Sequence, residues 1–336
     1  MAVLTAIDED DARAVLAARG LGELRALEGL AAGSVNSNFA LHTGDGRRFF
    51  LRLYEEQGMA GAERETAMLS RFAAAGVPTP APLPLLDGAS PASPERDRGG
   101  AGFVSVVKGK PATVFPWREG QMRCQASVTV ADARRVGEGL ARVHVAGRGE
   151  EAVAGRFGFR ELGARLDFIE RSEDIRFAPL ATTLRAALVE ASARRDRSLP
   201  GGLMHGDLFR DNVLWDASGE LGALLDFESA CEGTYAYDLM VTVLSWCFGD
   251  DFDAALATSM RAGYESVRKL EEAERNALAA EGTFAALRFT VTRITDYAMR
   301  VSDGPRVIKD WRRFMRRYDR LTELGREGVK ELLGAT

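Results

Sequence analysis

The chain has 336 residues, 46% of them hydrophobic, so it is long enough to form a large core or two lobes. A net charge of −5 argues against nucleic acid or an anionic membrane as the main partner. The three cysteines lack paired spacing, which argues against a disulfide framework and against a zinc site.

The N-terminal segment predicts a first helix over residues 5–19, with Thr5 or Asp8 as its cap and acidic residues in its first turn. This acidic turn excludes the basic and then apolar layout of a signal peptide. No later apolar run is long enough to span a bilayer. We therefore expect a cytoplasmic protein.

A polar, glycine-containing loop is predicted at residues 33–38, between the first two of three strand-like runs. These runs are residues 24–30, 40–43 and 48–54. Backbone N–H groups of such a loop can bind nucleotide phosphates, and Ser34, Ser37 and Asn38 can add side-chain donors. A hairpin loop without a ligand is the alternative.

A strand cation and a helix carboxylate form a second candidate for nucleotide binding. Arg52 lies in the third strand-like run, and Glu65 lies in a helix predicted over residues 60–75. A strand cation that is held by a carboxylate of the next helix can bind the phosphate oxygens of a nucleotide. We predict this pair here, because the guanidinium of Arg52 can contact phosphate oxygens in a bidentate manner. An exposed cation beside a solvated glutamate is the alternative.

Two further strand-like runs, residues 103–107 and 112–115, complete the predicted N-terminal sheet. The second run ends near Phe115 and Trp117, where the chain can offer contacts to an adenine. We place the lobe boundary there, with a nucleotide-binding lobe over residues 1–115 and a catalytic, substrate-binding lobe over 116–336.

The second lobe is mostly helical by its hydrophobic periodicity. Helices are predicted at residues 129–145, 159–171, 179–195 and 237–248, with a basic amphipathic helix near 306–321. The helix at 237–248 is apolar nearly all round, as a central buried helix is. Asp238 at its start can accept backbone N–H bonds and brace a neighbouring loop.

Three polar side chains follow short apolar runs between residues 203 and 228. We expect Asp207, Asn212 and Asp226 to meet at one end of these buried strand pieces. Phosphoryl transfer needs a carboxylate that deprotonates the attacking hydroxyl, and oxygen ligands for Mg²⁺. Asp207 fits the first role, and the other two side chains fit the second. Turn and cap formation is the alternative for these acids.

This pattern resembles the catalytic loop and metal-binding aspartate of the protein-kinase-like fold, in the form found in aminoglycoside phosphotransferases and choline kinases. The residues that carry the likeness are His205, Gly206, Asp207 and Asn212, followed by Asp226. Together with segments 33–39, 51–55, 235–238 and 246–248, the chain is similar to type II homoserine kinases over nearly its whole length.

The resemblance implies an α+β, two-lobed protein-kinase-like fold, with an antiparallel sheet in the small N-terminal lobe and a larger helical C-terminal lobe. It also implies ATP and Mg²⁺ as cosubstrates, Asp207 as the base, and Asn212 and Asp226 as metal ligands. The reaction would transfer the γ-phosphoryl group to the hydroxyl of L-homoserine, on the way to threonine.

An amino-acid acceptor needs opposite charges for its carboxylate and its ammonium group in a desolvated pocket. The candidate partners are Arg293, Asp296, Glu232, Tyr235 and Arg210. Arg210 lies in the catalytic loop, so we also assign it to the catalytic set. Arg293 and Asp296 could instead form a surface ion pair.

Two other functions compete with homoserine phosphorylation. A kinase of the same fold could use another small alcohol, such as an aminoglycoside, an amino sugar or choline. The replacement of the usual lysine by Arg52 leaves a nucleotide-binding pseudokinase as the second alternative, against which the three polar residues of the catalytic stretch argue.

Overall fold

The computed structural model describes most of the chain. The described residues are 4–31, 35–87, 102–150, 153–172, 174–299 and 309–335. They belong to two units, Met1–Glu119 and Gly120–Thr336. The division falls slightly beyond the boundary expected at 115/116, because the backbone of Trp117 still donates to the carbonyl of Arg48 in the sheet (3.3 Å).

The N-terminal unit contains a five-stranded antiparallel sheet with the strand order β1-β2-β3-β5-β4. Its strands are β1 (Leu24–Leu30), β2 (Ser37–Thr43), β3 (Arg48–Leu53), β4 (Val104–Val107) and β5 (Lys110–Pro116). The register pairs Ser37 with Leu53 and Asn38 with Arg52. The prediction that Ser37 and Asn38 lie in a loop is therefore wrong, because pairing with β3 extends β2 to Ser37.

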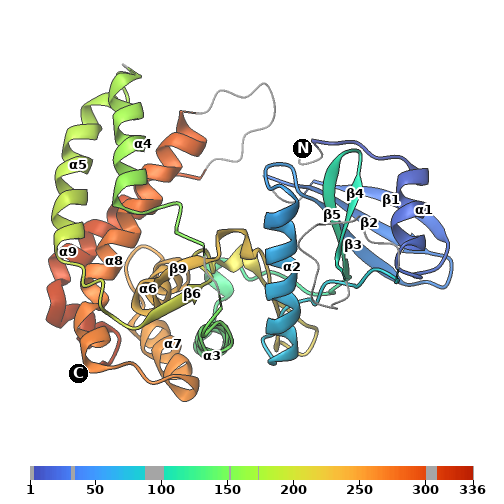
Figure 1. Ribbon diagram of the computed structural model, residues 1–336. Helices are drawn as coiled ribbons and strands as arrows, with labels where there is room; N and C mark the ends of the chain where they lie inside the picture. Colours follow the sequence, from blue (N-terminus) through green and yellow to red (C-terminus); the bar gives the residue numbers. More distant parts are fainter. Residues whose placement is uncertain are drawn as a thin grey trace. The chain divides into compact units, whose positions relative to one another are not determined.

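Two helices flank this sheet, as Figure 1 shows: α1 (Glu9–Ala17) packs on β1 and β4, and α2 (Met59–Ala74) packs on β4 and β5. The α1 helix begins later than the predicted residue 5. Asp8 and Asp11 form a capping box that starts the helix at Glu9. The backbone N–H groups of Leu4 and Thr5 instead donate to the Ser37 hydroxyl, at 2.8 and 2.9 Å.

The C-terminal unit is mostly helical. Its helices are α3 (Val130–Ala146), α4 (Phe159–Arg171), α5 (Ala178–Ala193), α6 (Tyr235–Trp246), α7 (Ala254–Val267), α8 (Glu272–Arg293) and α9 (Arg312–Leu332). Every residue of α6 is buried, as its apolar sequence predicts. The α8 helix packs against α5, α6 and α9, and a π-helical turn, Ile294–Ala298, follows it (Figure 1).

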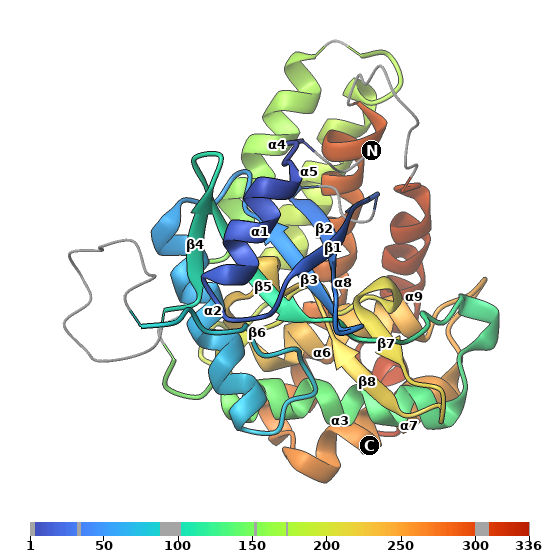
Figure 2. The ribbon, with the colours of Figure 1, turned by 90° about the vertical axis from the view of Figure 1, so that its right-hand side faces the viewer.

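A pair of glycines allows α3 and α7 to pack closely, and Figure 2 shows the two helices side by side. A Cβ on Gly137 would collide with the carbonyl oxygen of Met260, and one on Gly263 with that of Arg134. Only glycine fits at this crossing, because the backbones touch without intervening side chains. The crossing also fixes α3, whose last turn carries His144.

Four short strands complete the C-terminal unit: β6 (Gly201–Met204), β7 (Val213–Trp215), β8 (Leu221–Leu224) and β9 (Cys231–Thr234). They form two antiparallel pairs, β6 with β9 and β7 with β8. The α+β fold with an antiparallel N-terminal sheet and a helical C-terminal part is thus confirmed. None of the helices in the described part of the chain is both long and apolar enough to cross a membrane.

Candidate active site

The two strand pairs carry the stretch with the candidate catalytic residues. Residues 205–212 connect β6 to β7, and residues 225–230 connect β8 to β9. The two connections touch each other, because the backbone N–H of Leu225 donates to the carbonyl of Asn212 at 2.9 Å. A metal or substrate bound by one connection can therefore be contacted by the other.

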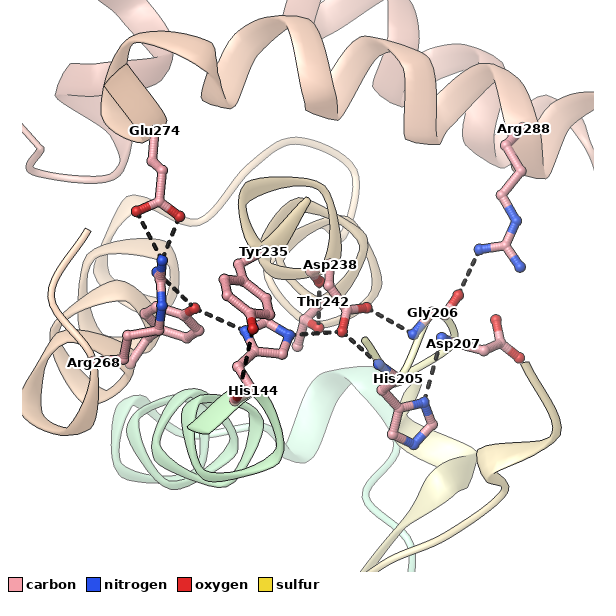
Figure 3. A network of polar contacts seen from close by, with 11 residues as sticks. His144, His205, Gly206, Asp207, Tyr235, Asp238, Thr242, Arg268, Glu274 and Arg288 are labelled. Atoms are coloured by element: carbon pink, nitrogen blue, oxygen red, sulfur yellow. Dashed lines mark hydrogen bonds and ion pairs between the residues drawn. The ribbon is translucent and has the colours of Figure 1, made fainter. Parts of the chain in front are cut away.

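Asp238, in the first turn of α6, holds the peptide groups at the start of the catalytic loop (Figure 3). One carboxylate oxygen accepts the N–H of His205 at 2.7 Å, and the other accepts that of Gly206 at 2.8 Å. The ring of His205 donates to the carbonyl of Leu225 at 3.0 Å. The prediction that Asp238 braces the loop is confirmed, and the ring of His205 in addition ties the loop to the connection between β8 and β9.

A chain of buried hydrogen bonds fixes Asp238 from behind (Figure 3). His144 Nε2 lies 2.9 Å from the Asp238 carboxylate and Nδ1 lies 2.7 Å from the Tyr264 hydroxyl, which accepts from Arg268 at 3.1 Å. The arginine donates to the phenol, so the phenol donates to Nδ1 and the histidine donates from Nε2. Burial lowers the pKa of His144, which favours this neutral form.

The pKa of Asp238 is held low by the same contacts. Burial alone would raise it, but the hydrogen bonds from the His144 ring and from the N–H of Gly206 outweigh that effect and lower the pKa of the carboxyl. The group is thus a buried carboxylate whose oxygens are all engaged by donors. Such a group holds a loop well because each donor would lose a partner if the loop moved.

Asp238→Asn is expected to lower the free energy of unfolding by about 3 kcal/mol, because the amide keeps one acceptor oxygen and turns an N–H₂ group toward a backbone donor. Urea unfolding followed by circular dichroism measures the change. Asp253→Asn is the matched control: Asp253 caps α7 through the N–H of Leu256 (3.0 Å), and asparagine caps a helix equally well. Equal unfolding midpoints for the two variants would contradict the bracing role.

Asp207 is partly buried and follows the braced glycine. Desolvation raises the pKa of its carboxyl, the Arg288 guanidinium opposes the rise, and the charge of Asp226 adds to it. A carboxylate with a raised pKa is a stronger base toward a hydroxyl proton. Its backbone carbonyl accepts a hydrogen bond from the side-chain amide of Asn212 at 2.8 Å, so the Asn212 side chain is held by the backbone of Asp207.

Asn212 and Asp226 offer oxygen atoms suited to a divalent cation. The amide nitrogen of Asn212 is used by the loop, which leaves its Oδ1 for a metal. Asp226 Oδ1 is buried and has no hydrogen-bond partner within the described ranges, and its backbone is left-handed (φ 62°). A carboxylate oxygen in this state needs a cation or a donor. These two residues therefore fit Mg²⁺, which takes its other ligands from water and phosphate.

Two protein ligands make a sparse metal site. Among the residues that the structure describes, no group of three or more His, Cys, Asp or Glu side chains is arranged to hold a metal. A closed structural site is thus absent from that part of the chain. A Mg²⁺ that is shared with nucleotide phosphates needs only one or two carboxylates from the protein, so the donor set suits this use.

Arg210 is directed away from solvent at the start of a 3₁₀ turn, Arg210–Asn212. Its guanidinium donates to the carbonyl of Ser245 near the end of α6. Desolvation and the charge of Arg313 lower its pKa. The contact ties the catalytic loop to α6 at a second place, so a catalytic role for Arg210 stays a prediction with a structural role beside it.

The predicted pair of Arg52 and Glu65 is present in the N-terminal unit. The guanidinium of Arg52 on β3 lies 3.3 Å from the Glu65 carboxylate on α2, and both side chains are largely buried, with 15% and 6% of their surface exposed. Tyr54 also donates to Glu65, at 3.3 Å. The alternative of an exposed strand cation is wrong, because the side chain is enclosed between sheet and helix.

The other predicted nucleotide contacts lie in or beside the same sheet. Ser37 is fully buried and donates to Glu55 at 2.5 Å, and Asn38 is buried beside it on β2. Phe115 is 6% exposed on β5. The ring of Trp117 lies under the Arg48 guanidinium, 3.5 Å from centroid to Cζ. Ser34 lies outside the described residues.

The predicted acceptor contacts lie at separate places in the C-terminal unit. Arg293 donates to the carbonyl of Asp310 at 3.1 Å, and burial lowers its pKa to about 10. Asp296, in the π-helical turn, pairs with Arg165 of α4. The alternative of an Arg293–Asp296 surface pair is not found among the ion pairs of the described residues.

The remaining two candidates differ in exposure. Glu232 is exposed on β9, where its backbone N–H donates to the carbonyl of Val153 at 2.9 Å. Tyr235 is buried, with its ring stacked on His144 at 4.4 Å between centroids and beneath the Arg268 guanidinium at 4.5 Å. The tyrosine is therefore part of the packing behind the loop.

Sequence reasoning missed Arg288 on α8. This side chain is 3% exposed, donates to the carbonyl of Gly206, and is the positive charge with the largest effect on the pKa of Asp207. Lys309 also acts on that pKa and lies 4.0 Å from Asp211. A lone arginine inside an apolar helical run carries no signal of its partner, which lies 82 residues earlier in the chain.

An antiparallel sheet with a buried cation–glutamate pair, and a helical unit with a braced His-Gly-Asp loop beside an Asp-Phe-Glu turn, define a phosphotransferase with a protein-kinase-like fold. Comparison with known proteins agrees, because the phosphotransferase enzyme family matches residues 26–273. The homoserine kinase of Caulobacter sp. (strain K31) is 35% identical over 343 residues, which cover 100% of this chain and 99% of that protein.

The chain therefore belongs to the phosphotransferase enzyme family. It is a kinase-type enzyme that acts on an alcohol group of a small molecule and uses ATP. The resemblance to homoserine kinases expected from the sequence is confirmed.

Solved structures show the same fold at low identity. An aminoglycoside phosphotransferase from Alicyclobacillus acidocaldarius subsp. acidocaldarius DSM 446 is 16% identical, with a TM-score of 0.65 over 98% of this chain and 96% of that chain. An amicoumacin kinase in complex with AMP-PNP, Ca²⁺ and Ami is 13% identical, with a TM-score of 0.62 over 92% and 88%. At these sequence identities the structural similarity supports the protein-kinase-like fold and supports no conclusion about the substrate.

Proposed function

We propose that this protein transfers the γ-phosphoryl group of ATP to the side-chain hydroxyl of L-homoserine and forms O-phospho-L-homoserine. The observation that carries the proposal is the braced loop with Asp207 and Asn212 beside Asp226, in a chain that matches a homoserine kinase over its full length. The product would serve threonine biosynthesis.

Asp207 is the proposed base. As the hydroxyl oxygen forms its bond to the γ phosphorus, the bond from that phosphorus to the bridging oxygen of ADP breaks, and the hydroxyl proton passes to the Asp207 carboxylate. Asn212 Oδ1 and the Asp226 carboxylate are the proposed ligands of Mg²⁺. When bound, Mg²⁺ neutralises charge on the phosphate oxygens.

The N-terminal unit supplies the proposed nucleotide contacts. Arg52, paired with Glu65, is the proposed ligand of the phosphate oxygens, which a guanidinium can bind in a bidentate manner. The other residues proposed to contact the nucleotide bind either its phosphates or its adenine. They are Ser34 and Asn38 for the phosphates, and Phe115 with Trp117 for the adenine. The Ser37 hydroxyl is not included, because it already binds Glu55 and the backbone N–H groups of Leu4 and Thr5.

The acceptor contacts of the proposal are charges in the C-terminal unit. Arg293 donates to the backbone carbonyl of Asp310, and the negative charge of Asp207 acts on the pKa of Arg293, which supports a role toward the acceptor carboxylate. Asp296 is the proposed partner of the ammonium group, shared with Arg165. The exposed Glu232 is a second candidate for that role, whereas the packing of Tyr235 favours a structural role.

An acceptor screen tests the proposal. Purified protein with Mg²⁺-ATP is offered L-homoserine, L-serine, L-threonine, choline, an amino sugar and an aminoglycoside, and products are read by ³¹P NMR. We expect O-phospho-L-homoserine, and at least about 10²-fold lower kcat/KM for an alcohol that lacks the carboxylate, because the half-buried charge of Arg293 is then left without its proposed partner.

Each alternative outcome identifies a different function. Turnover of another alcohol with no turnover of homoserine would assign that alcohol to the same chemistry and refute the proposed acceptor. Binding of Mg²⁺-ATP with no turnover of any hydroxyl compound would indicate a nucleotide-binding pseudokinase. A titration of the protein with AMP-PNP, followed by calorimetry, separates this outcome from an unfolded preparation.

A further inference from the structure

Arg288 is a buried cation without a carboxylate at ion-pair distance within the described residues. It is 3% exposed on α8. One terminal nitrogen donates to the carbonyl of Gly206 and lies 3.4 Å from the Tyr237 hydroxyl. One hydrogen bond to a carbonyl and one contact with a phenol do not offset the cost of burying the guanidinium charge. Stability of the fold therefore does not account for an arginine at this position.

Two aromatic rings enclose the Arg288 guanidinium. Its Cζ lies 4.1 Å from the ring centroid of Phe157 and 4.2 Å from that of Phe289. Cation–π contacts on both rings stabilise the charge and restrict the guanidinium to one orientation. The two rings thus fix the guanidinium independently of its hydrogen bond to the loop.

The peptide groups around Gly206 are bound on both sides (Figure 3). Asp238 accepts the N–H groups of His205 and Gly206, and Arg288 binds the carbonyl that links Gly206 to Asp207. Gly206 has a φ of +75°, and a Cβ there would lie 2.9 Å from the carbonyl oxygen of Ser229. A peptide is planar, so fixing this carbonyl fixes the plane from which the next residue starts.

We propose that Arg288 is a positioning residue for phosphoryl transfer, which fixes the carbonyl of Gly206 and thereby sets the direction in which Asp207 presents its carboxylate. The inference rests on the proposed function of Asp207 as the base. Figure 3 shows the Arg288 guanidinium and the Asp207 carboxyl on the same side of the loop. The charge of Arg288 also opposes the rise that burial causes in the pKa of Asp207.

Arg288→Ala should lower kcat by about 10²-fold and leave KM for ATP and the Kd of AMP-PNP within about threefold, because a base displaced by about 1 Å loses alignment with the acceptor but makes no nucleotide contact. Rates are divided by the fraction of protein that binds AMP-PNP. Partly unfolded protein then does not lower the measured kcat.

Chemical rescue separates positioning from general stability. Free guanidinium or methylguanidinium at about 10–50 mM is far below denaturing concentrations and can enter the slot between Phe157 and Phe289 that the alanine variant leaves empty. We expect kcat of the alanine variant to rise at least about tenfold as the carbonyl of Gly206 regains a charged donor.

Arg317→Ala is the matched control. Arg317 is also 3% exposed, donates to the carbonyls of Leu244 and Phe248, and lies 4.3 and 4.7 Å from the rings of Phe248 and Phe314. In the described part of the chain no hydrogen bond or ion pair joins Arg317 to residues 205–212; the charge of Arg210 acts on its pKa from a distance. This variant should lose stability, keep kcat within about threefold in its folded fraction, and gain no activity from guanidinium.

Hydrogen exchange of the segment 203–213, read by mass spectrometry, gives a result that does not depend on any acceptor. We expect exchange in Arg288→Ala to be faster than in the unaltered protein and to become slower when guanidinium is added. Exchange in Arg317→Ala should equal that of the unaltered protein. Arg288→Lys, which fills the slot, should be intermediate in kcat and resistant to rescue.

Unchanged kcat in Arg288→Ala, or guanidinium that restores neither kcat nor exchange, would overturn the positioning role. A protein that phosphorylates no acceptor in its unaltered form would refute the proposed function instead. If Arg288→Ala still increased exchange in such an inactive protein, Arg288 would order the loop without affecting any reaction. That result would also overturn the proposal that Arg288 positions a catalytic base.

Discussion

Replacing Asp207 with asparagine is expected to lower kcat by about 10²- to 10⁴-fold while the Kd of AMP-PNP changes by less than about threefold. The amide keeps the shape of the side chain and cannot accept the hydroxyl proton. The loop should survive the change, because its hydrogen bond from Asn212 goes to the backbone carbonyl of Asp207 and not to the carboxylate. Steady-state kinetics with saturating acceptor, and calorimetry with AMP-PNP, measure the two quantities.

Asp211→Asn provides the comparison within the same loop. Asp211 is exposed and its nearest cation, Lys309, lies at 4.0 Å, so the change should leave kcat within about threefold. If the two variants lost activity to the same extent, general sensitivity of the loop would explain the loss and Asp207 would not be the base. Loss of AMP-PNP binding by the Asp207 variant would also exclude that role.

Local sequence patterns were sufficient to predict most of the helices and strands. The strand β1 and the helix α4 have the bounds predicted from their sequences, because their ends coincide with glycine, polar residues and the end of the apolar period. The start of α1 was placed too early. Thr5 and Asp8 both satisfy the cap pattern, and the choice depends on Ser37, which binds the backbone of residues 4 and 5 from another element.

The partners of charged residues were harder to predict than their presence. Arg52 and Glu65 were paired correctly because a strand and the following helix are adjacent in kinase-like lobes. Asp296 was expected to contact the acceptor or to pair with Arg293, and it binds Arg165, 131 residues away. Arg288 binds a backbone carbonyl, for which no residue type is diagnostic. Contacts between residues so far apart in the chain depend on how the helices pack, which hydrophobic periodicity alone does not determine.

The catalytic loop has a more constrained backbone than its sequence indicated. The predicted side chains are there, but their directions depend on Asp238 below the loop, on Arg288 from α8, and on a left-handed residue at Asp226. Two of these three features lie in the C-terminal helices. The large helical unit therefore serves the reaction through backbone contacts as well as through the acceptor site proposed above.

Asp226→Asn is expected to abolish Mg²⁺-dependent phosphoryl transfer, with kcat lowered by at least about 10³-fold, and to leave the apoprotein as stable as before or more stable by up to about 1 kcal/mol. Asparagine tolerates the left-handed backbone of this position (φ 62°), whereas alanine would add strain. The change removes a carboxylate whose buried Oδ1 has no hydrogen-bond partner in the described part of the chain. Activity against Mg²⁺ concentration and thermal unfolding without ligands measure the two effects.

The combination of lost activity and retained stability is what distinguishes a metal ligand from a structural aspartate. Mg²⁺-AMP-PNP should raise the unfolding temperature of the unaltered protein and of Asp250→Asn, an exposed control, and should have little effect on Asp226→Asn. A carboxylate that only shaped the turn would show the opposite pattern, because its loss would destabilise the apoprotein and leave the Mg²⁺ dependence intact. That pattern would remove Asp226 from the metal site and leave Asn212 without a second protein ligand.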